Sequence, residues 1–398
     1  MKKVWDKWTR IALVKRILVG LILGAVLGIA VPQATGIAIL GDVFVSALKA
    51  IAPLLVFFLV ISSLCNAGKS HGGVIKTVII LYMFSTVLAA VIAVFASMAF
   101  PVKMTLANAA TDTSAPQGIV EVLNNLLLNV VANPVSSLVN ANYVGILMWA
   151  VLLGLAFRVA DKMTKKVLAD VADGISMVVT WIINLAPFGI FGLVFNTVST
   201  NGLDIFTTYG KLLILLVGCM LFIYFVTNPL LVYWCIRQNP YPLIFQCLKR
   251  SALTAFFTRS SAANIPVNMK VCEEMGLDRD TYSVTIPLGA TINMDGAAIT
   301  ITVMTMATAF TLGIHVDIPT AIILSLLAAL SACGASGVAG GSLLLIPMAC
   351  SLFGISDDIS MQVVAVGFII GVVQDSVETA LNSSSDLLLS ASAEFRQW

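Results

Sequence analysis

The sequence predicts an all-α protein that crosses a membrane several times, and three observations indicate this fold class. Hydrophobic residues make up 59% of the 398 residues and charged residues only 11%, whereas soluble domains carry about 25% charged residues. Apolar runs without charges recur along the chain at the length of a spanning helix, about 20 residues. Basic residues collect in alternate connections between these runs, as in polytopic membrane proteins.

Eight apolar runs lack any charged residue, and a ninth carries acidic residues. They cover residues 17–41, 50–68, 77–102, 122–157, 174–203, 212–236, 296–316, 318–356 and 359–389. Polar connections are expected at 69–76, 103–121, 158–173, 237–242 and 270–280. A basic stretch precedes the first run, which we expect to be a retained helix and not a cleaved signal peptide, because no clear small-residue cleavage pattern follows it.

The basic residues orient the chain. They lie before the first run and in alternate connections: Lys2, Lys3, Lys7, Arg10, Lys69, Lys76, Arg158, Lys162, Lys165, Lys166, Arg237, Lys249 and Arg250. Because such residues favour cytoplasmic loops, we expect both termini in the cytoplasm and the protein in a bacterial inner membrane.

Two segments do not fit simple spans. The segment 243–269 has basic flanks and a Ser- and Ala-rich middle at 258–266, and 318–356 has a Gly-rich middle at 334–342. Each is predicted to be a re-entrant hairpin with a non-helical tip, which membranes tolerate only beside protein or a water-filled cavity. Each is followed by a span with acidic residues. Such a repeat of an interrupted segment followed by a polar span is typical of a transporter site.

The last run carries polar residues along one helical face, namely Asp375, Glu378, Thr379, Asn382 and Asp386. A charge at the bilayer centre costs about 2.5–3.5 kcal/mol, so this face should meet a cavity, a cation or a partner. The alternative is an amphipathic helix in the cytoplasm, which the apolar stretch 361–373 disfavours.

The segment 289–296 predicts an unwound helix midpoint, because Asn293 and Asp295 stand between Gly289 and Gly296. Free carbonyl oxygens with amide and carboxylate oxygens suit a hard cation such as Na+. The alternative is a kinked helix with an internally hydrogen-bonded Asp295.

Other polar residues leave two interpretations open. Arg259 is either a loop residue reaching the cytoplasmic interface or a buried partner of a carboxylate at the first hairpin tip. Tyr82, Ser85 and Thr86 in the third run belong to a site or simply bridge membrane helices.

Composition excludes several classes of function. The net charge of +2 gives no support for nucleic-acid binding. The seven cysteines form no CxxC pair, and His71 and His315 are isolated, so we expect neither a disulfide framework nor a zinc site.

The motifs 258–266 (TRSSAANIP), 289–296 (GATINMDG) and the polar pattern 375–386 resemble the dicarboxylate/amino acid:cation symporter family, which includes glutamate and archaeal aspartate transporters. The resemblance covers essentially the whole chain and is greatest to bacterial members that carry serine and threonine with sodium. It implies a glutamate-transporter fold with inverted repeats, comprising eight transmembrane helices plus two re-entrant hairpins, in a homotrimer. It also implies a trimer-holding scaffold, 1–73 and 103–203, and a transport part, 74–102 and 204–398, that slides through the membrane.

The resemblance also implies site residues. The substrate would meet Arg259, Ser260 and Ser261 at the first tip, Val338 at the second, and Asp375, Glu378, Thr379 and Asn382, with Asp375 on the amino group. A proline of relatives at the second tip is Ala339 here. Sodium would be bound through Tyr82, Ser85, Thr86, Gly289, Thr291 with carbonyls of 332–335, Asn293, Asp295, Asn382 and Asp386.

Two departures point to neutral substrates. Members that carry acidic substrates place an arginine where this chain has Glu378 and a threonine where it has Ala297. A glutamate would repel a substrate carboxylate by roughly 3 kcal/mol at about 5 Å and an effective dielectric near 20. We therefore expect sodium-coupled symport of serine and threonine, with Glu378 either pairing with Arg259 or accepting a hydrogen bond from the substrate hydroxyl.

Three rival functions remain at this point. A proton-coupled symporter would titrate the buried carboxylates, a channel would use the hairpins as a filter, and an intramembrane hydrolase would use Asp295 with Asp375. We expect a transporter and not an enzyme.

Overall fold

The computed structural model describes residues 11, 13–66, 73–106, 128, 131–202, 205–333, 335 and 340–396. Within these ranges all regular secondary structure is helical and no strand occurs. Six helical segments are long and apolar enough to cross a membrane: Thr35–Asn66, Gly73–Ala99, Lys162–Asn184, Phe206–Ile236, Arg279–Thr311 and Asp357–Phe395. The all-α class and the multi-pass membrane character are confirmed.

The first two helices divide at a different place from the one predicted. They are α2 (Leu13–Ala30) and α3 (Ala38–Asn66), joined through the short η1 (Thr35–Ile37). The chain turns at Pro32, which disfavours helix at the preceding residue. The helix α3 then continues through Asp42 and Lys49, where we expected a boundary. Asp42 is exposed, and Lys49 forms ion pairs, so neither charge interrupts the helix.

The predicted polar connection 158–173 is wrong for most of its length. The helix α8 already starts at Lys162 and runs to Asn184. The elements before it are α4 (Gly73–Ala99), α6 (Pro134–Val139), α7 (Tyr143–Ala156) and η2 (Phe157–Val159). The Asp161 side chain accepts a hydrogen bond from Thr164 N at 2.7 Å and so caps this helix. Lys162, Lys165 and Lys166 lie on α8, and Arg158 lies in η2, so none of them is in a loop. The next helix, α9 (Ala186–Asn201), has a proline in its first turn, which favours a helix start there.

The first predicted hairpin consists of helical arms that meet at a non-helical turn. A long helix precedes it, made of α10 (Ile205–Phe222), the wider π turn η3 (Ile223–Thr227) and α11 (Asn228–Ile236). The hairpin comprises α12 (Tyr241–Cys247), η4 (Leu248–Ala252), α13 (Leu253–Thr258) and α14 (Ser261–Glu274). Between the last two helices Arg259 is left-handed, with φ 53°, and Ser260 is extended.

The predicted unwound midpoint is confirmed. The helix α15 (Arg279–Ile292) ends and α16 (Asp295–Thr311) begins around two non-helical residues, Asn293 (φ −98°, ψ 79°) and Met294 (φ −118°, ψ 53°). The segment predicted as the second hairpin, called the second hairpin below, comprises α17 (Ile318–Ala332), η5 (Ser342–Leu345) and α18 (Ile346–Ser351). Its tip at 334 and 336–339, with Val338 and Ala339, lies outside the described residues. The chain ends with α19 (Asp357–Phe395), a helix of 39 residues.

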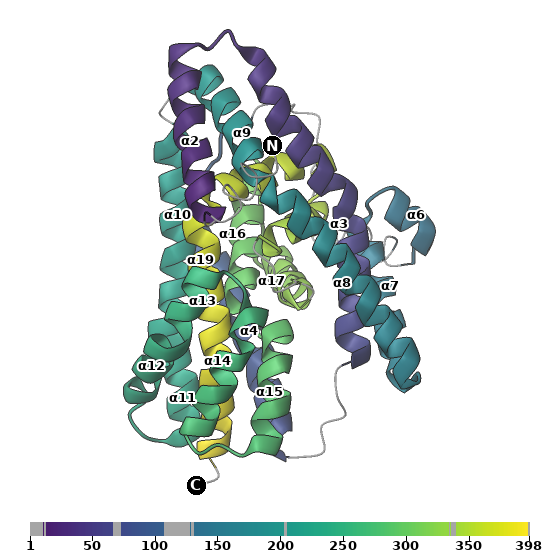
Figure 1. Cartoon of the computed structure of the whole chain (residues 1–398), viewed down its shortest axis with the longest axis vertical. Helices are drawn as coiled ribbons and strands as arrows, with labels where there is room; N and C mark the ends of the chain where they lie inside the picture. Colours follow the sequence, from purple (N-terminus) through teal and green to yellow (C-terminus); the bar gives the residue numbers. More distant parts are fainter. Residues whose placement is uncertain are drawn as a thin grey trace.

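The helices pack in two groups (Figure 1). In the first, α2 lies along α9, and α3 packs on α7, α8 and α9. In the second, α4 packs on α15, α16, α17 and α19, and α19 also contacts both hairpins. In Figure 1 the yellow α19 runs through this second group, beside α13, α14 and α16. The polar face of α19 therefore lies inside the protein and not against lipid.

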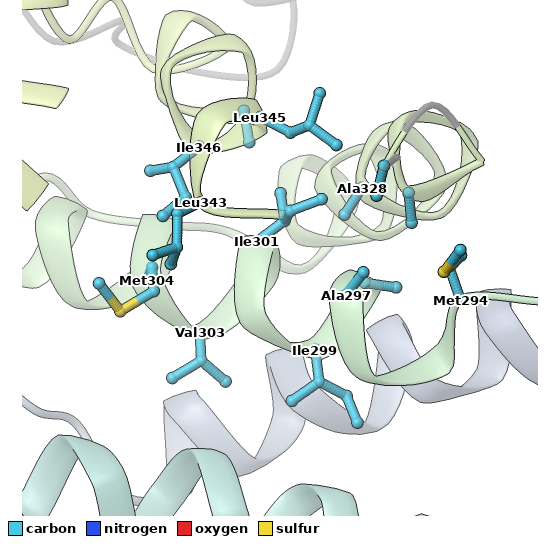
Figure 2. Close-up of a cluster of buried hydrophobic side chains, with 14 of the residues drawn as sticks. Met294, Ala297, Ile299, Ile301, Val303, Met304, Ala328, Leu343, Leu345 and Ile346 are labelled. Atoms are coloured by element: carbon cyan, nitrogen blue, oxygen red, sulfur yellow. The ribbon is translucent and has the colours of Figure 1, made fainter. Parts of the chain in front are cut away.

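An apolar cluster anchors the second hairpin to α16 (Figure 2). Leu343, Leu345 and Ile346 gather over Ile301 and Met304 of α16, and all five side chains are buried. Within a membrane such side chains hold segments together through van der Waals packing. The return arm of the hairpin is thus held firmly just beyond its tip.

Candidate functional site

A buried carboxylate on α19 touches both hairpins. The Nε atom of Arg259, at the first hairpin turn, donates to Asp375 Oδ2 at 2.6 Å. The backbone N–H of Gly340, on the return arm of the second hairpin, donates to Asp375 Oδ1 at 3.1 Å. Asp375 is 3% exposed. A charge this deep requires partners, and each hairpin supplies one.

Arg259 is a buried ion-pair partner and not an interface residue. It is 9% exposed, and its Nη1 atom is buried with no hydrogen-bond partner among the described residues. Its left-handed backbone is uncommon for a residue with a side chain. Beside it, Ser260 Oγ accepts from Ala263 N at 3.2 Å and caps α14, whose first residue, Ser261, is buried.

Glu378 lies one helical turn from Asp375 and pairs with neutral groups, not with Arg259. Its Oε2 atom accepts hydrogen bonds from Gln374 Nε2 at 2.5 Å, Thr300 Oγ1 at 2.6 Å and Ser342 Oγ at 2.9 Å. Glu378 is 5% exposed. A Cβ at Gly296 would lie 2.9 Å from Glu378 Cα, so α16 and α19 approach closely only because this residue is glycine.

The remaining predicted substrate residues on α19 are also buried. Asn382 Oδ1 accepts from Gly296 N at 2.7 Å and so caps the start of α16. The Thr379 hydroxyl donates to the Asp375 carbonyl within its own helix at 2.8 Å. Ala297, where acidic-substrate members have threonine, is fully buried.

A second polar cluster surrounds Asp295 at the start of α16. Ser85 Oγ donates to Asp295 Oδ2 at 2.8 Å, and Thr86 Oγ1 donates to Asp295 Oδ1 at 3.1 Å. Thr86 Oγ1 also accepts from the N–H of Met294 in the unwound segment, at 3.2 Å. All of these α4 and α16 side chains are buried. The hydroxyls of α4 therefore contact the unwound segment directly.

A third polar cluster surrounds Asp386. Asn293 Nδ2 donates to Asp386 Oδ1 at 2.9 Å, and the Tyr82 hydroxyl lies 2.9 Å from the Asp386 carbonyl oxygen and 2.7 Å from Ser390 Oγ. A Cβ at Gly289 would lie 2.7 Å from Asp386 Oδ1. Asn293 Oδ1 is buried and has no hydrogen-bond partner among the described residues.

The structure brings most predicted residues together. The three clusters lie along α19 and the α15–α16 break, but Tyr82 and Asn293 hydrogen-bond around Asp386, whereas Ser85 and Thr86 surround Asp295. Thr291 stands apart: its side chain is exposed, and its hydroxyl donates to Leu288 O at 2.8 Å. Val338 falls outside the described residues.

Several polar residues of the site were not predicted. They are Gln374, Thr300 and Ser342 around Glu378, the Gly340 amide on Asp375, and Asn228, which donates to Ser385 at 3.0 Å. Gln374 could have been found from its position four residues before Glu378 on one helical face. Thr300 carries no such signal, because threonine is common in apolar helices.

The oxygen atoms of the Asp295 cluster and of the Asp386 cluster fit a hard monovalent cation. Among the described residues no group of three or more His, Cys, Asp and Glu side chains is placed to hold a metal ion. The Asp295 cluster instead combines a carboxylate with two hydroxyl oxygens, and the Asp386 cluster combines a carboxylate with hydroxyl, amide and carbonyl oxygens, which are ligands that hard cations prefer. The buried Asn293 Oδ1, without a donor, is an acceptor that such a cation would satisfy.

Comparison with known proteins gives a consistent result. A family model described as the sodium:dicarboxylate symporter family matches residues 13–394. The chain is 58% identical over 399 residues to a protein of Bifidobacterium adolescentis named serine/threonine transporter SstT, covering 100% of this chain and 93% of that one. It is 55% identical over 399 residues to a protein of Streptococcus thermophilus with the same name, covering 100% and 99%.

These matches span the whole chain and confirm the resemblance that the three motifs indicated. The family and the relatives are transporters and not enzymes. The hydrolase interpretation of Asp295 and Asp375 is therefore dropped, and the chain belongs to the sodium:dicarboxylate symporter family.

Proposed function

We propose that this protein carries small neutral amino acids, serine and threonine, into the cell together with sodium. The observation that carries the proposal is the buried Asp375 carboxylate, contacted by Arg259 from the first hairpin and by the Gly340 amide from the second. A buried anion between two hairpins suits the ammonium group of an amino acid. The names of the two relatives agree with this substrate class.

The substrate ammonium would replace Arg259 on Asp375. The Arg259 guanidinium now neutralises this carboxylate, and a second buried cation beside it would be repelled. Substrate entry would therefore displace the Arg259 side chain. Ser260, Ser261 and the second tip near Val338 would then contact the substrate carboxylate, with Thr379 and Asn382 beside the amino-acid backbone.

Glu378 supports the choice of neutral substrates. It is one turn from Asp375 and has no cationic partner among the described residues. An ionised Glu378 would repel a substrate carboxylate about 5 Å away by roughly 3 kcal/mol at an effective dielectric near 20, a factor of more than 100 in affinity, and a protonated Glu378 would offer that carboxylate no cation. Aspartate and glutamate should therefore compete poorly with serine.

Sodium would bind at the Asp295 and Asp386 clusters as a transported ion. Ser85, Thr86 and Asp295 supply one oxygen-rich set, and Asn293, Asp386 and the backbone at Gly289 supply the other. Tyr82 and Asn382 would complete these shells, and Thr291 with carbonyls of 332–335 would form a separate sodium site. A cation would neutralise each carboxylate, so substrate affinity should rise with sodium concentration.

The membrane arrangement that we propose has eight spans and two re-entrant hairpins. The spans are α2, α3, α4, the α6–α7 region, α8–α9, α10–α11, α15–α16 and α19, and the hairpins are α12–α14 and α17–α18. The packing of α2, α3 and α7–α9 supports a scaffold of 1–73 and 103–203, and we propose from the family resemblance that this scaffold holds a homotrimer. The packing of α4 with α15, α16 and α19 supports a moving part of 74–102 and 204–398. This part would slide past the scaffold. Both termini would lie in the cytoplasm, with the protein in a bacterial inner membrane.

Sodium entry supplies enough free energy for accumulation. One sodium ion crossing 100 mV yields about 2.3 kcal/mol, and a tenfold gradient adds about 1.4 kcal/mol. One ion could therefore concentrate a neutral amino acid several hundredfold, because each 1.4 kcal/mol corresponds to a factor of ten.

The decisive experiment is uptake of labelled serine by proteoliposomes that contain the purified protein. We expect saturable, concentrative uptake that requires an inward sodium gradient at fixed pH, that threonine inhibits strongly and that aspartate inhibits weakly. Asp295→Asn and Asp386→Asn should each reduce sodium-driven accumulation. Uptake that follows a proton gradient without sodium would refute sodium coupling, and aspartate competing as well as serine would refute the role of Glu378.

A further inference from the structure

Glu378 receives an unusual concentration of neutral donors on one oxygen atom. Gln374, Thr300 and Ser342 all donate to Oε2, at 2.5, 2.6 and 2.9 Å. Gln374 Nε2 also donates to Thr300 Oγ1 at 2.8 Å, which ties two of these donors to each other. All three donors are fully or almost fully buried. The carboxylate is therefore held in one orientation by residues from three segments, α16, η5 and α19.

The other carboxylate oxygen of Glu378 is left without a donor. None of the described residues donates a hydrogen bond to Oε1, although a carboxylate oxygen offers about two acceptor sites. Close by, Gln374 Oε1 is buried and has no partner among the described residues. Gln374 itself is fully buried. An unsatisfied buried acceptor costs about 1–3 kcal/mol, so Gln374 Oε1, on a residue that donates to Glu378, points to a missing donor.

The carboxylate of Glu378 lies where the side chain of a bound amino acid would reach if its ammonium group contacted Asp375. Asp375 and Glu378 are three residues apart on α19, which places their Cβ atoms roughly 5–6 Å apart on one helical face. In serine three bonds separate the ammonium nitrogen from the hydroxyl oxygen, a span of about 3 Å. One small molecule can therefore reach Asp375 with its ammonium and Glu378 with its hydroxyl.

We propose that Gln374, Thr300 and Ser342 are specificity-determining residues that form, with Glu378, a subsite for the hydroxyl group of the substrate. They would saturate Oε2 and aim Oε1 at the substrate hydroxyl, which donates to it. The ligand class is a small amino acid with a side-chain hydroxyl group. The inference rests on the proposed function and deepens it, because it names the residues that favour serine and threonine over alanine.

Ser342 gives the subsite a link to the second hairpin. It lies at the start of η5, and the residues after it, Leu343 to Ile346, are packed on α16 (Figure 2). Its hydroxyl reaches Glu378 only when this arm lies against α19. Ser342 therefore joins the return arm of the second hairpin to the subsite on α19.

The test compares serine with alanine, which lacks only the hydroxyl oxygen, in three variants reconstituted in proteoliposomes. Thr300→Val and Ser342→Ala each remove one donor to Glu378. Thr302→Val makes the same change as Thr300→Val two residues further along α16, where the hydroxyl has no hydrogen-bond partner among the described residues. The readout is the ratio of the alanine and serine concentrations that half-inhibit sodium-driven uptake of labelled threonine.

We expect the unsubstituted protein to prefer serine by at least about tenfold, the value of one hydrogen bond to a charged group. Thr300→Val and Ser342→Ala should each reduce this preference about threefold or more, mainly by weakening serine, whereas Thr302→Val should keep it. A preference within twofold of the unsubstituted value in both subsite variants would overturn the inference. Because Ser342→Ala removes a single oxygen atom, it decides the matter if Thr300→Val yields no monodisperse protein.

The same experiment separates this inference from the function on which it rests. If the unsubstituted protein shows no sodium-driven uptake of threonine or serine, the proposed function fails. If uptake is normal but the variants retain the preference for serine, only the hydroxyl subsite is refuted.

Discussion

Gly289 provides the sharpest test of the proposed sodium site around Asp386. The structure leaves no room for a side chain there: a Cβ would lie 2.7 Å from Asp386 Oδ1, 2.8 Å from Asp386 Cγ and 2.9 Å from the Tyr82 hydroxyl oxygen. These distances are well inside ordinary van der Waals contact. In Gly289→Ala the Asp386 carboxylate must therefore move.

The cost of this movement can be estimated from the packing. Asp386 is 1% exposed and is held by Asn293 at 2.9 Å, so its carboxylate cannot swing into solvent. Overpacking a buried site by one methyl group costs about 1–3 kcal/mol. If this cost falls on the sodium-bound state, the apparent Kd for sodium rises about 5- to 150-fold.

The measurement is a sodium titration of serine binding to the purified protein, with Gly210→Ala as the matched control. A Cβ at Gly210 would meet nothing within 4 Å, and both glycines lie inside helices. The gain in helix propensity, about 0.5–1 kcal/mol, is thus common to both variants. We expect Gly210→Ala to titrate like the unsubstituted protein. If Gly289→Ala also did so, Asp386 would not be part of a sodium site.

Two further predictions concern contacts away from the site. Lys49 of α3 forms ion pairs with Asp358, at 2.6 Å, and with Asp357, at 3.2 Å, at the start of α19. Because the Lys49–Asp358 pair is partly exposed, a double-mutant cycle of Lys49→Met and Asp358→Asn should give a coupling free energy of about 0.2–1 kcal/mol. High salt should abolish this coupling. A coupling above 2 kcal/mol would contradict this. Asp317 caps α17 through Thr320 N at 2.9 Å, so Asp317→Ala should cost about 1 kcal/mol of stability at pH 7. The hydrogen bonds from Thr320 hold the pKa of the Asp317 carboxyl below its usual value. The ionised carboxylate therefore stabilises the folded protein at pH values above the unfolded-state pKa, and this stabilisation is lost as the pH falls through the lower folded-state pKa. Asp317→Asn, which still caps but cannot titrate, should show no such loss in melting temperature between pH 5 and 3, and an identical pH profile for both proteins would refute the linkage.

The sequence predicted the buried polar elements best. The offsets of Asp375, Glu378 and Asp386 place them on one face of a helix, and a face with three carboxylates cannot meet lipid at acceptable cost. The structure buries all three. The break at Asn293 was predictable for a similar reason, because glycines flank polar residues whose spacing does not suit one helical face.

The sequence was less informative about helix ends and partners. In a hydropathy analysis Lys49 and Lys162 are expected in loops because they are charged, yet both lie in helices. Lys49 forms ion pairs with the start of α19, and Lys162 is at the start of the amphipathic α8. The partner of Arg259 also could not be chosen from the sequence. Asp375 and Glu378 are both within one turn on α19, and only the fold of the hairpin decides that Arg259 reaches Asp375.

Asp375 and Glu378, at the proposed substrate site, differ in the groups that contact them. Asp375 is paired with a cation and with one amide of a hairpin, so exchanging that cation for a substrate ammonium changes its charge balance little. Glu378 has only neutral donors among the described residues, so an anionic group beside it would be repelled without compensation. An arginine in place of Glu378 would lose the donors Thr300, Ser342 and Gln374 as partners and attract a carboxylate instead. We therefore infer that the choice between neutral and acidic substrates depends on the side chain at position 378 together with the three residues that donate to it.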